Sequence, residues 1–91
     1  MSVLLEAHGL VHGDRDASYG HPLDNYTRMA GMVNSLLAEK LAKPLTPDDM
    51  VLVMLAMKLA RQAHRPKRDN LVDISGYAEC AQMIEDERKA R

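Results

Sequence analysis

The sequence predicts an all-α protein, a small bundle of about four helices that is completed by oligomerisation. Three observations predict this class: apolar residues recur at steps of three and four, no segment alternates apolar and polar residues as a strand does, and helix caps mark the boundaries. A chain of 91 residues makes one domain, 1–91, and buries a modest share of its surface. We therefore expect a homo-oligomer.

The expected elements begin with a short helix at 3–9, which ends around Gly9 and Gly13. Residues 13–23 are expected to form a polar loop, because glycine and the position before proline both disfavour helix. A long helix then spans about 24–42, with Asp24 as its N-cap and an apolar stripe at steps of three and four.

The next helix, at about 47–63, has the clearest start in the sequence, with Thr46 as N-cap and Pro47 at the first helical position. It is apolar almost all round up to Met57, so we expect it to lie at the centre of the bundle. The last helix spans about 70–87, capped by Asp69 or Asn70. Short connections favour antiparallel neighbours.

Composition and charge narrow the function classes. Twelve basic and thirteen acidic residues give a net charge of −1, which argues against general nucleic-acid binding. A single cysteine, Cys80, excludes an internal disulfide and fits a reducing cytoplasm. The chain starts without a secretory leader, and the longest apolar run, residues 50–57, is too short to cross a bilayer. We expect a cytoplasmic protein with no membrane partner.

The chemically richest residues lie at the junction of the last two predicted helices. Lys58 and Arg61 share one helical face and follow a strongly apolar run, so their stems are expected to be partly buried. Asp69, Asp73 and Tyr77 are spaced by four and form a matching stripe on the next helix. Antiparallel packing would bring the two stripes face to face.

Two interpretations of this junction stay open. In the first, Asp69 and Asp73 hold Mg²⁺ through oxygen ligands while cations bind phosphate groups. In the second, the carboxylates only pair with the cations of the preceding helix and lock the hairpin. The phosphate contacts of the first interpretation would come from Lys58 and Arg61 and from the basic connection that follows, His64, Arg65, Lys67 and Arg68.

The polar segment before the long helix offers groups that can shape a pocket. Tyr19 and Asn25 could recognise a base or a ribose by stacking and by amide hydrogen bonds, with Tyr77 as a further wall. Alternatively, Tyr19 and Tyr26 pack on the core and Asn25 supports the cap of the long helix. His8 and His12 are spaced for one helical face, but the nearby glycines leave that geometry uncertain, so we do not expect a transition-metal site there.

A set of spaced residues resembles a group of small phage and prophage proteins of unassigned function. The set comprises Arg-x3-Tyr-Gly at 15–20, Asn-Tyr at 25–26, Lys-x2-Arg-x2-His at 58–64 and Asp-x3-Asp-x2-Gly-Tyr-Ala at 69–78. That group in turn looks like a remote relative of the all-α MazG-type nucleoside triphosphate pyrophosphohydrolases. This likeness implies a magnesium-ligand role for Asp73 and, for a phage protein, the cytoplasm of the bacterial host.

The sequence also departs from the MazG pattern. Lys58 and Arg61 stand in the region of the Glu-Glu-x2-Glu metal motif, and Asn70 replaces the glutamate of the second motif. Too few carboxylates remain for a conventional metal cluster. The leading expectation is therefore a phage-type accessory protein that binds a nucleotide or another phosphorylated small molecule at this junction. The alternatives are a MazG-like Mg²⁺-dependent pyrophosphohydrolase and a non-catalytic oligomeric module that binds a host protein.

Overall fold

The computed structural model describes all 91 residues except the side chain of Asp16. Within this described part the chain forms helices joined by turns, and no strand occurs, so the all-α expectation is confirmed. The helices are α1 (Val3–His12), α2 (Asp14–Tyr19), α3 (Pro22–Leu36), α4 (Pro47–His64) and α5 (Arg68–Ala90). None of the described helices combines the length and the apolar character that crossing a bilayer requires.

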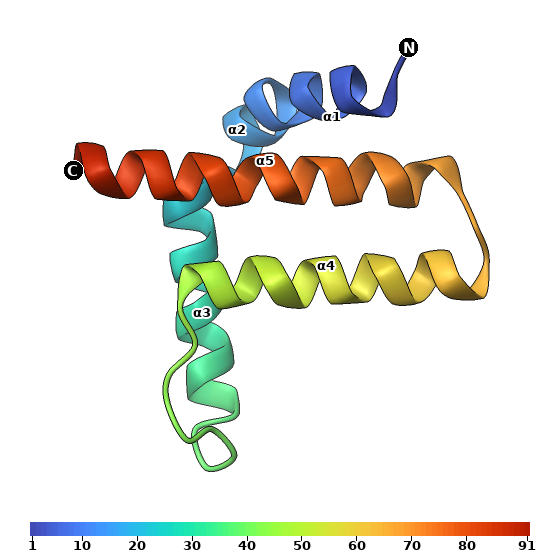
Figure 1. Cartoon of the computed structure of the whole chain (residues 1–91). Helices are drawn as coiled ribbons and strands as arrows, with labels where there is room; N and C mark the ends of the chain where they lie inside the picture. Colours follow the sequence, from blue (N-terminus) through green and yellow to red (C-terminus); the bar gives the residue numbers. More distant parts are fainter.

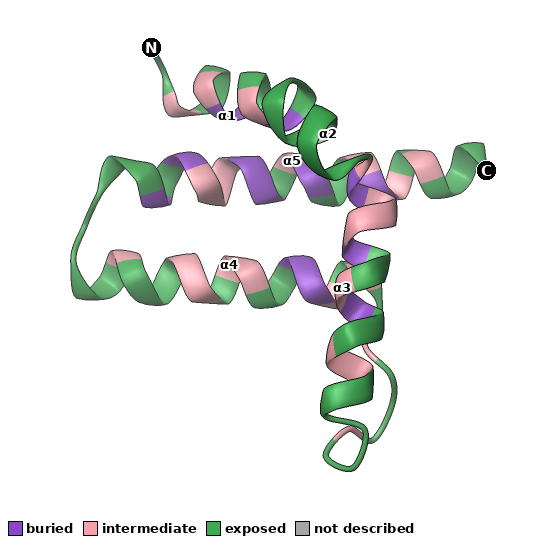
Figure 2. Ribbon diagram, turned by 180° about the vertical axis from the view of Figure 1, so that it is seen from behind, coloured by how far each residue is buried: buried purple, intermediate pink, exposed green. Residues whose placement is uncertain are grey.

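The long helix α5 is the centre of the molecule. It packs against α1 on one side, against α4 in an antiparallel hairpin on another, and against α3 towards its C-terminal end (Figure 1). Figure 2 shows that buried residues follow α5 along much of its length, whereas α4 is buried mainly in its first turns. The expectation that the apolar helix at 47–63 lies at the centre is therefore wrong for the single chain, because α4 packs on α5 and α3 but leaves Leu52, Val53 and Leu59 exposed.

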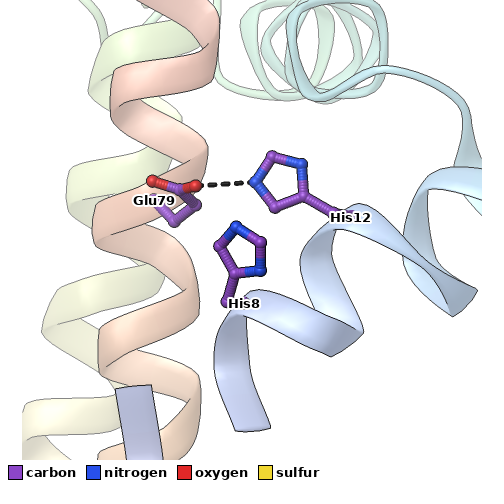
Figure 3. Close-up of side chains that lie close together, drawn as sticks. All are labelled: His8, His12 and Glu79. Atoms are coloured by element: carbon purple, nitrogen blue, oxygen red, sulfur yellow. Dashed lines mark hydrogen bonds and ion pairs between the residues drawn. The ribbon is translucent and has the colours of Figure 1, made fainter. Parts of the chain in front are cut away.

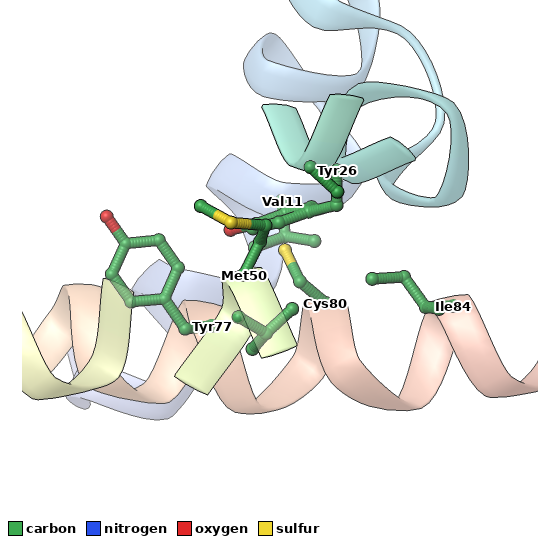
Figure 4. Packing of buried hydrophobic residues seen from close by; sticks show 8 residues of the cluster. Val11, Tyr26, Met50, Tyr77, Cys80 and Ile84 are labelled. Atoms are coloured by element: carbon green, nitrogen blue, oxygen red, sulfur yellow. The ribbon is translucent and has the colours of Figure 1, made fainter. Parts of the chain in front are cut away.

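The hydrophobic core lies where α3 crosses the hairpin of α4 and α5. Ile84 and Val51 are the largest side chains that are fully buried. Around them pack Val11, Tyr26, Met50, Tyr77 and Cys80, so every helix except the short α2 contributes to one cluster (Figure 4). Packing of this cluster fixes which face of α5 each of its neighbours covers.

The segment expected to be a polar loop, 13–23, is largely helical. Asp14–Tyr19 forms α2, and Gly20 then adopts a φ of 80°, a left-handed conformation that glycine reaches without strain. The next helix begins at Pro22 rather than at Asp24, because the imidazole of His21 accepts a hydrogen bond from the Leu23 amide at 3.1 Å and acts as the N-cap.

Two further boundaries differ from the sequence-based expectations. The helix expected at 24–42 ends at Leu36, and the segment after it is held by Asn34, whose side chain bonds both the amide and the carbonyl of Leu45. The first helix continues through Gly9 to His12 instead of stopping at residue 9. Local propensity alone did not reveal the end of α1, because its packing on α5 outweighs the cost of one glycine, Gly9.

The start of α4 follows the expectation closely. Thr46 and Asp49 form a reciprocal capping box, with Pro47 at the first helical position. The start of α5 differs, because the helix begins at Arg68 with Lys67 as its N-cap residue, and no described side chain caps this end. Asp69 and Asn70, the expected caps, lie within the first turn.

Candidate functional site

The predicted pairing of the last two helices centres on Asp73. Lys58 Nζ of α4 lies 2.7 Å from Asp73 Oδ2 of α5, and Arg15 Nη2 of α2 lies 3.4 Å from the other oxygen, Oδ1. The Lys58 and Asp73 side chains are only 13% and 19% exposed. The carboxylate is thus compensated by two cations from two other elements, which makes this pair a link in the fold as well as a candidate for ligand contact.

An open pocket of about 600 Å³ lies beside this pair, at the end of the hairpin where α4 turns into α5. We call it the junction pocket. Its volume falls within the range of small-molecule sites. Its walls carry four permanent cations, one imidazole and one carboxylate, and its lining residues are Lys58, Ala60, Arg61, His64, Arg65, Lys67, Asp69 and Asn70.

Gln62 organises the turn that forms this pocket. Its side-chain carbonyl accepts hydrogen bonds from the Lys67 amide at 3.0 Å and from the side-chain amide of Asn70 at 3.2 Å. Asn70 is the one buried polar residue among the described side chains of the core. Gln62 was not predicted from the sequence, where its only signal was an amide side chain one residue after Arg61 at the end of an apolar helix.

Arg68 does not reach the junction pocket. Its guanidinium forms an ion pair with Glu6 of α1 and donates a hydrogen bond to the Met1 carbonyl oxygen at 2.6 Å. Because α5 already begins at Arg68, its side chain leaves the first turn on the side that faces α1 and Asp69 leaves it on the side that faces the pocket. The predicted phosphate contact of Arg68 is replaced by a tie between the two helices.

The three residues expected to shape the pocket lie elsewhere. Tyr77 is buried in the core and borders a space of about 10 Å³ beneath α1, next to Asp73. Tyr19 and Asn25 line a separate recess of about 50 Å³ beside Arg15. The junction pocket therefore brings Lys58, Arg61, His64 and Asp69 together with Arg65 and Lys67. Five predicted site residues do not line it: Tyr19, Asn25, Arg68, Tyr77 and Asp73, although Asp73 pairs with Lys58 of its wall.

Two titratable groups near the centre are held in their neutral forms. Burial raises the pKa of the Cys80 thiol and that of the Tyr26 phenol. A thiol that resists ionisation is a poor nucleophile, so Cys80 acts here as a small core residue. The chemistry available at the junction pocket is instead electrostatic: an array of cations suited to an anionic ligand.

Comparison with known proteins identifies relatives of this chain. A family model described as "Domain of unknown function (DUF6378)" matches residues 2–85. The Gene 55 protein of Mycobacterium phage D29 is 37% identical over 87 residues, which cover 94% of this chain and 55% of the relative. The Gene 55 protein of Mycobacterium phage L5 is 36% identical over 92 residues, covering 97% of this chain and 57% of the relative.

The chain thus spans a little over half the length of these curated relatives. No solved structure gives a significant match. The expected kinship with small phage proteins of unassigned function is confirmed, whereas the likeness to MazG-type enzymes stays a prediction. The match covers nearly all of α1 to α5, and the chain belongs to the DUF6378 family.

Proposed function

We propose that the junction pocket binds the phosphate groups of a nucleotide or of another phosphorylated small molecule. The observation that carries this proposal is the excess of positive charge on its walls: Lys58 is already paired with Asp73, and Arg61, Arg65 and Lys67 share the walls with a single carboxylate, Asp69. The chain as a whole has a net charge of −1, so this excess is local. Concave clusters of Arg and Lys are suited to phosphate because they supply several charge-assisted hydrogen bonds at once.

Three of these cations lack an acidic partner, which supports the proposal. Among the described residues, no carboxylate forms an ion pair with Arg61, Arg65 or Lys67. The uncapped first turn of α5 adds backbone N–H groups at the same end of the hairpin. The helix dipole favours cations at the C-terminus of α4, so a purely structural role would account for one or two of them. That role does not explain why the cations line a pocket.

A magnesium ion that accompanies such a ligand would meet Asp69, the one carboxylate on the pocket wall. Asp73, the other predicted ligand, would first have to release Lys58 or Arg15, because each of its oxygens already forms an ion pair with one of them. Binding of Mg²⁺ through Asp69 and through the phosphates themselves therefore disturbs the fold least. Asp73 is better suited to holding Lys58 in place.

Binding is tested by calorimetry and thermal shift with inorganic phosphate, pyrophosphate and ATP, each with and without Mg²⁺. A ligand that binds only the folded chain raises its Tm by mass action. Arg61→Ala, and Arg65→Ala with Lys67→Ala, should each weaken binding by about tenfold or more, since a hydrogen bond to a charged group contributes about 1.5–3 kcal/mol. Lys43→Ala, which removes an exposed cation far from the pocket, is the matched control.

The proposal fails if none of these anions shifts the Tm, or if Lys43→Ala weakens binding as much as Arg61→Ala. The same samples address the hydrolytic alternative, in which water attacks a pyrophosphate bond. Release of pyrophosphate from nucleoside triphosphates with Mg²⁺ or Mn²⁺, abolished in Asp69→Asn, would establish that activity. Binding without release would leave the pocket a sensor or carrier site.

A second candidate function rests on the outer face of α4, and we propose that this face binds a second copy of the chain. Leu52 and Leu59 are 63% and 56% exposed, although both lie on a helix of a 91-residue protein. With Ala56 and Ala63 they form one stripe at steps of three and four, which we call the α4 stripe. Two such stripes are self-complementary, because alternating large and small residues interdigitate in a two-fold symmetric pair.

Size-exclusion chromatography with light scattering tests this pairing. The wild-type chain is expected to run as a dimer or larger assembly, and Leu52→Glu with Leu59→Glu should yield a folded monomer, since both side chains point away from the core. The exposed Thr27→Glu of α3 is the control. A wild-type monomer would contradict self-association and leave the α4 stripe to a host protein, the remaining alternative.

A further inference from the structure

Two imidazoles and a carboxylate converge on the side of the molecule where α1 packs against α5. His8 and His12 project from successive turns of α1 towards Glu79 of α5 (Figure 3). His12 Nε2 lies 2.6 Å from Glu79 Oε2, and the centroids of the two imidazole rings are 4.3 Å apart. One potential ligand atom from each residue lies within 4.8 Å of the other two.

This convergence follows from features of the fold that the sequence alone left open. The helix continues through Gly9 to His12, so that two imidazoles at positions i and i+4 share a face. α1 packs directly on α5 at Gly76, where a Cβ would lie at ordinary contact distance, 3.4 Å from Val11 Cγ2. The ion pair between Arg68 and Glu6 fixes the other end of α1. The donors therefore stand on two helices that are already held together.

Hydrogen bonding explains only part of the arrangement. His12 and Glu79 form a hydrogen bond with each other, and this bond alone accounts for the position of those two side chains. His8 is exposed and has no hydrogen-bond partner among the described residues, and its ring lies beside the imidazole of His12 (Figure 3). An ion placed between the three residues would give each of them a ligand role.

The donor set selects a class of metal. Two imidazole nitrogens and one carboxylate oxygen suit Zn²⁺ and its first-row neighbours, whereas Mg²⁺ and Ca²⁺ prefer all-oxygen sites. Around a tetrahedral Zn²⁺ with bonds of roughly 2.0–2.1 Å, ligand atoms lie about 3.4 Å apart. His12 and Glu79 are 39% and 35% exposed, so rotation of the side chains can bring the ligand atoms closer than 4.8 Å. The direct contact between His12 and Glu79 would then be replaced by bonds from both residues to the ion.

We propose that His8, His12 and Glu79 bind one divalent ion of the Zn²⁺ class, which clamps α1 onto α5 and keeps a coordination position open to water. The three protein ligands and the exposed setting correspond to an incomplete coordination sphere rather than to a closed structural site. The site lies on the α1 side of α5 and shares no residue with the junction pocket. It stands independently of phosphate binding.

The test uses the full chain, freed of metal by a chelator, and ZnCl₂ as the probe. Calorimetry should give one Zn²⁺ per chain, and Zn²⁺ should raise the Tm. Replacing Zn²⁺ by Co²⁺ should produce the visible absorption of a low-coordinate cobalt site with nitrogen and oxygen ligands. A chain that takes up no Zn²⁺ and gives no cobalt spectrum overturns the proposal.

Single variants assign the ligands. His8→Ala, His12→Ala and Glu79→Gln should each weaken Zn²⁺ binding by at least about tenfold, because even partners outside the first coordination shell typically change metal affinity by roughly 10–100-fold. His8→Ala is the sharpest of the three, since it removes no hydrogen bond of the described chain and should leave the metal-free Tm unchanged while abolishing the Tm rise with Zn²⁺.

The matched control is His21→Asn. His21 also faces a carboxylate, with its Nε2 at 3.5 Å from Glu87 Oε2, but this pair includes only one imidazole. Asn at position 21 can still cap α3, so the variant should keep its fold. Zn²⁺ binding should be unchanged in this variant and in Arg61→Ala of the junction pocket. Equal losses in His21→Asn and His8→Ala would mean that the chain binds Zn²⁺ at scattered surface histidines, and the proposed site would be rejected.

Discussion

Breaking the Lys58–Asp73 pair should destabilise the chain far more than breaking an exposed ion pair does. Exposed pairs contribute about 0–1 kcal/mol, and removing one partner of a fully buried pair costs about 3–5 kcal/mol. With side chains 13% and 19% exposed, Lys58 and Asp73 lie between these limits. We expect Asp73→Ala to lower the free energy of unfolding by about 2 kcal/mol, which for a domain of this size lowers the Tm by about 8–16 °C.

Urea and thermal unfolding followed by circular dichroism measure this effect in a double-mutant cycle of Lys58→Met and Asp73→Ala. The double variant should lose less than the sum of the single variants, with a coupling of about 1 kcal/mol or more. The control is Lys89→Met, because Lys89 Nζ lies 3.4 Å from Glu85 Oε1 but the Lys89 side chain is 74% exposed. This variant should change the free energy of unfolding by no more than about 0.5 kcal/mol. Additive effects of Lys58→Met and Asp73→Ala would refute the reasoning.

The same pair decides between the two roles suggested for Asp73. If Asp73 serves to compensate Lys58, then Asp73→Asn releases that cation and should strengthen binding of inorganic phosphate in the junction pocket. If Asp73 holds Mg²⁺, as the likeness to MazG-type enzymes implies, the variant should weaken binding of Mg²⁺ with ATP and leave free phosphate unaffected. Calorimetry with the two ligands separates these outcomes.

Three further predictions test the packing and the electrostatics elsewhere. Gly76→Val should destabilise the chain by about 1–3 kcal/mol because its branches would press on Val11, whereas Gly76→Ala should be tolerated; urea unfolding measures both. Arg88 lowers the pKa of Asp48 in the folded state, so the pair stabilises the fold above the ordinary carboxyl range and loses this effect as pH falls; Asp48→Asn should flatten the dependence of Tm on pH below about 4. Burial keeps Cys80 protonated, so alkylation by iodoacetamide at neutral pH should be at least about tenfold slower in the folded chain than in urea.

The features that the sequence predicts well are those set by neighbouring residues. The capping box of Thr46 and Asp49 was readable because both partners lie within one turn. The helical character of segment 13–23 was not readable, since α2 packs against α1 and α3, and His21 lies beside Glu87 of α5. The spacing of Lys58 and Asp73 predicted their pairing once the two helices were antiparallel.

The candidate site shows the same limit. Helical periodicity says which residues share a face, but it does not say which neighbour covers that face. Arg68 and Asp69 are adjacent in sequence, yet one side chain turns to α1 and the other to the junction pocket. His12 and Glu79 are 67 positions apart, so no local pattern could join them. Long-range packing decides these contacts.

The contrast between α4 and α5 explains why the apolar helix is not the central one. A helix that is contacted on several sides needs small and polar residues where neighbours approach, and α5 accordingly buries Gly76 and Asn70 beside its apolar side chains. The apolar residues of α4 instead indicate surface that a helix can bury against another molecule as well as within its own chain. Because α4 buries only Met50 and Val51 fully within the chain, its remaining apolar surface is available for the second copy that we propose. Ala60 lies next to Leu59 of the α4 stripe and also lines the junction pocket, so a second copy bound there would come to rest at the edge of the proposed phosphate site.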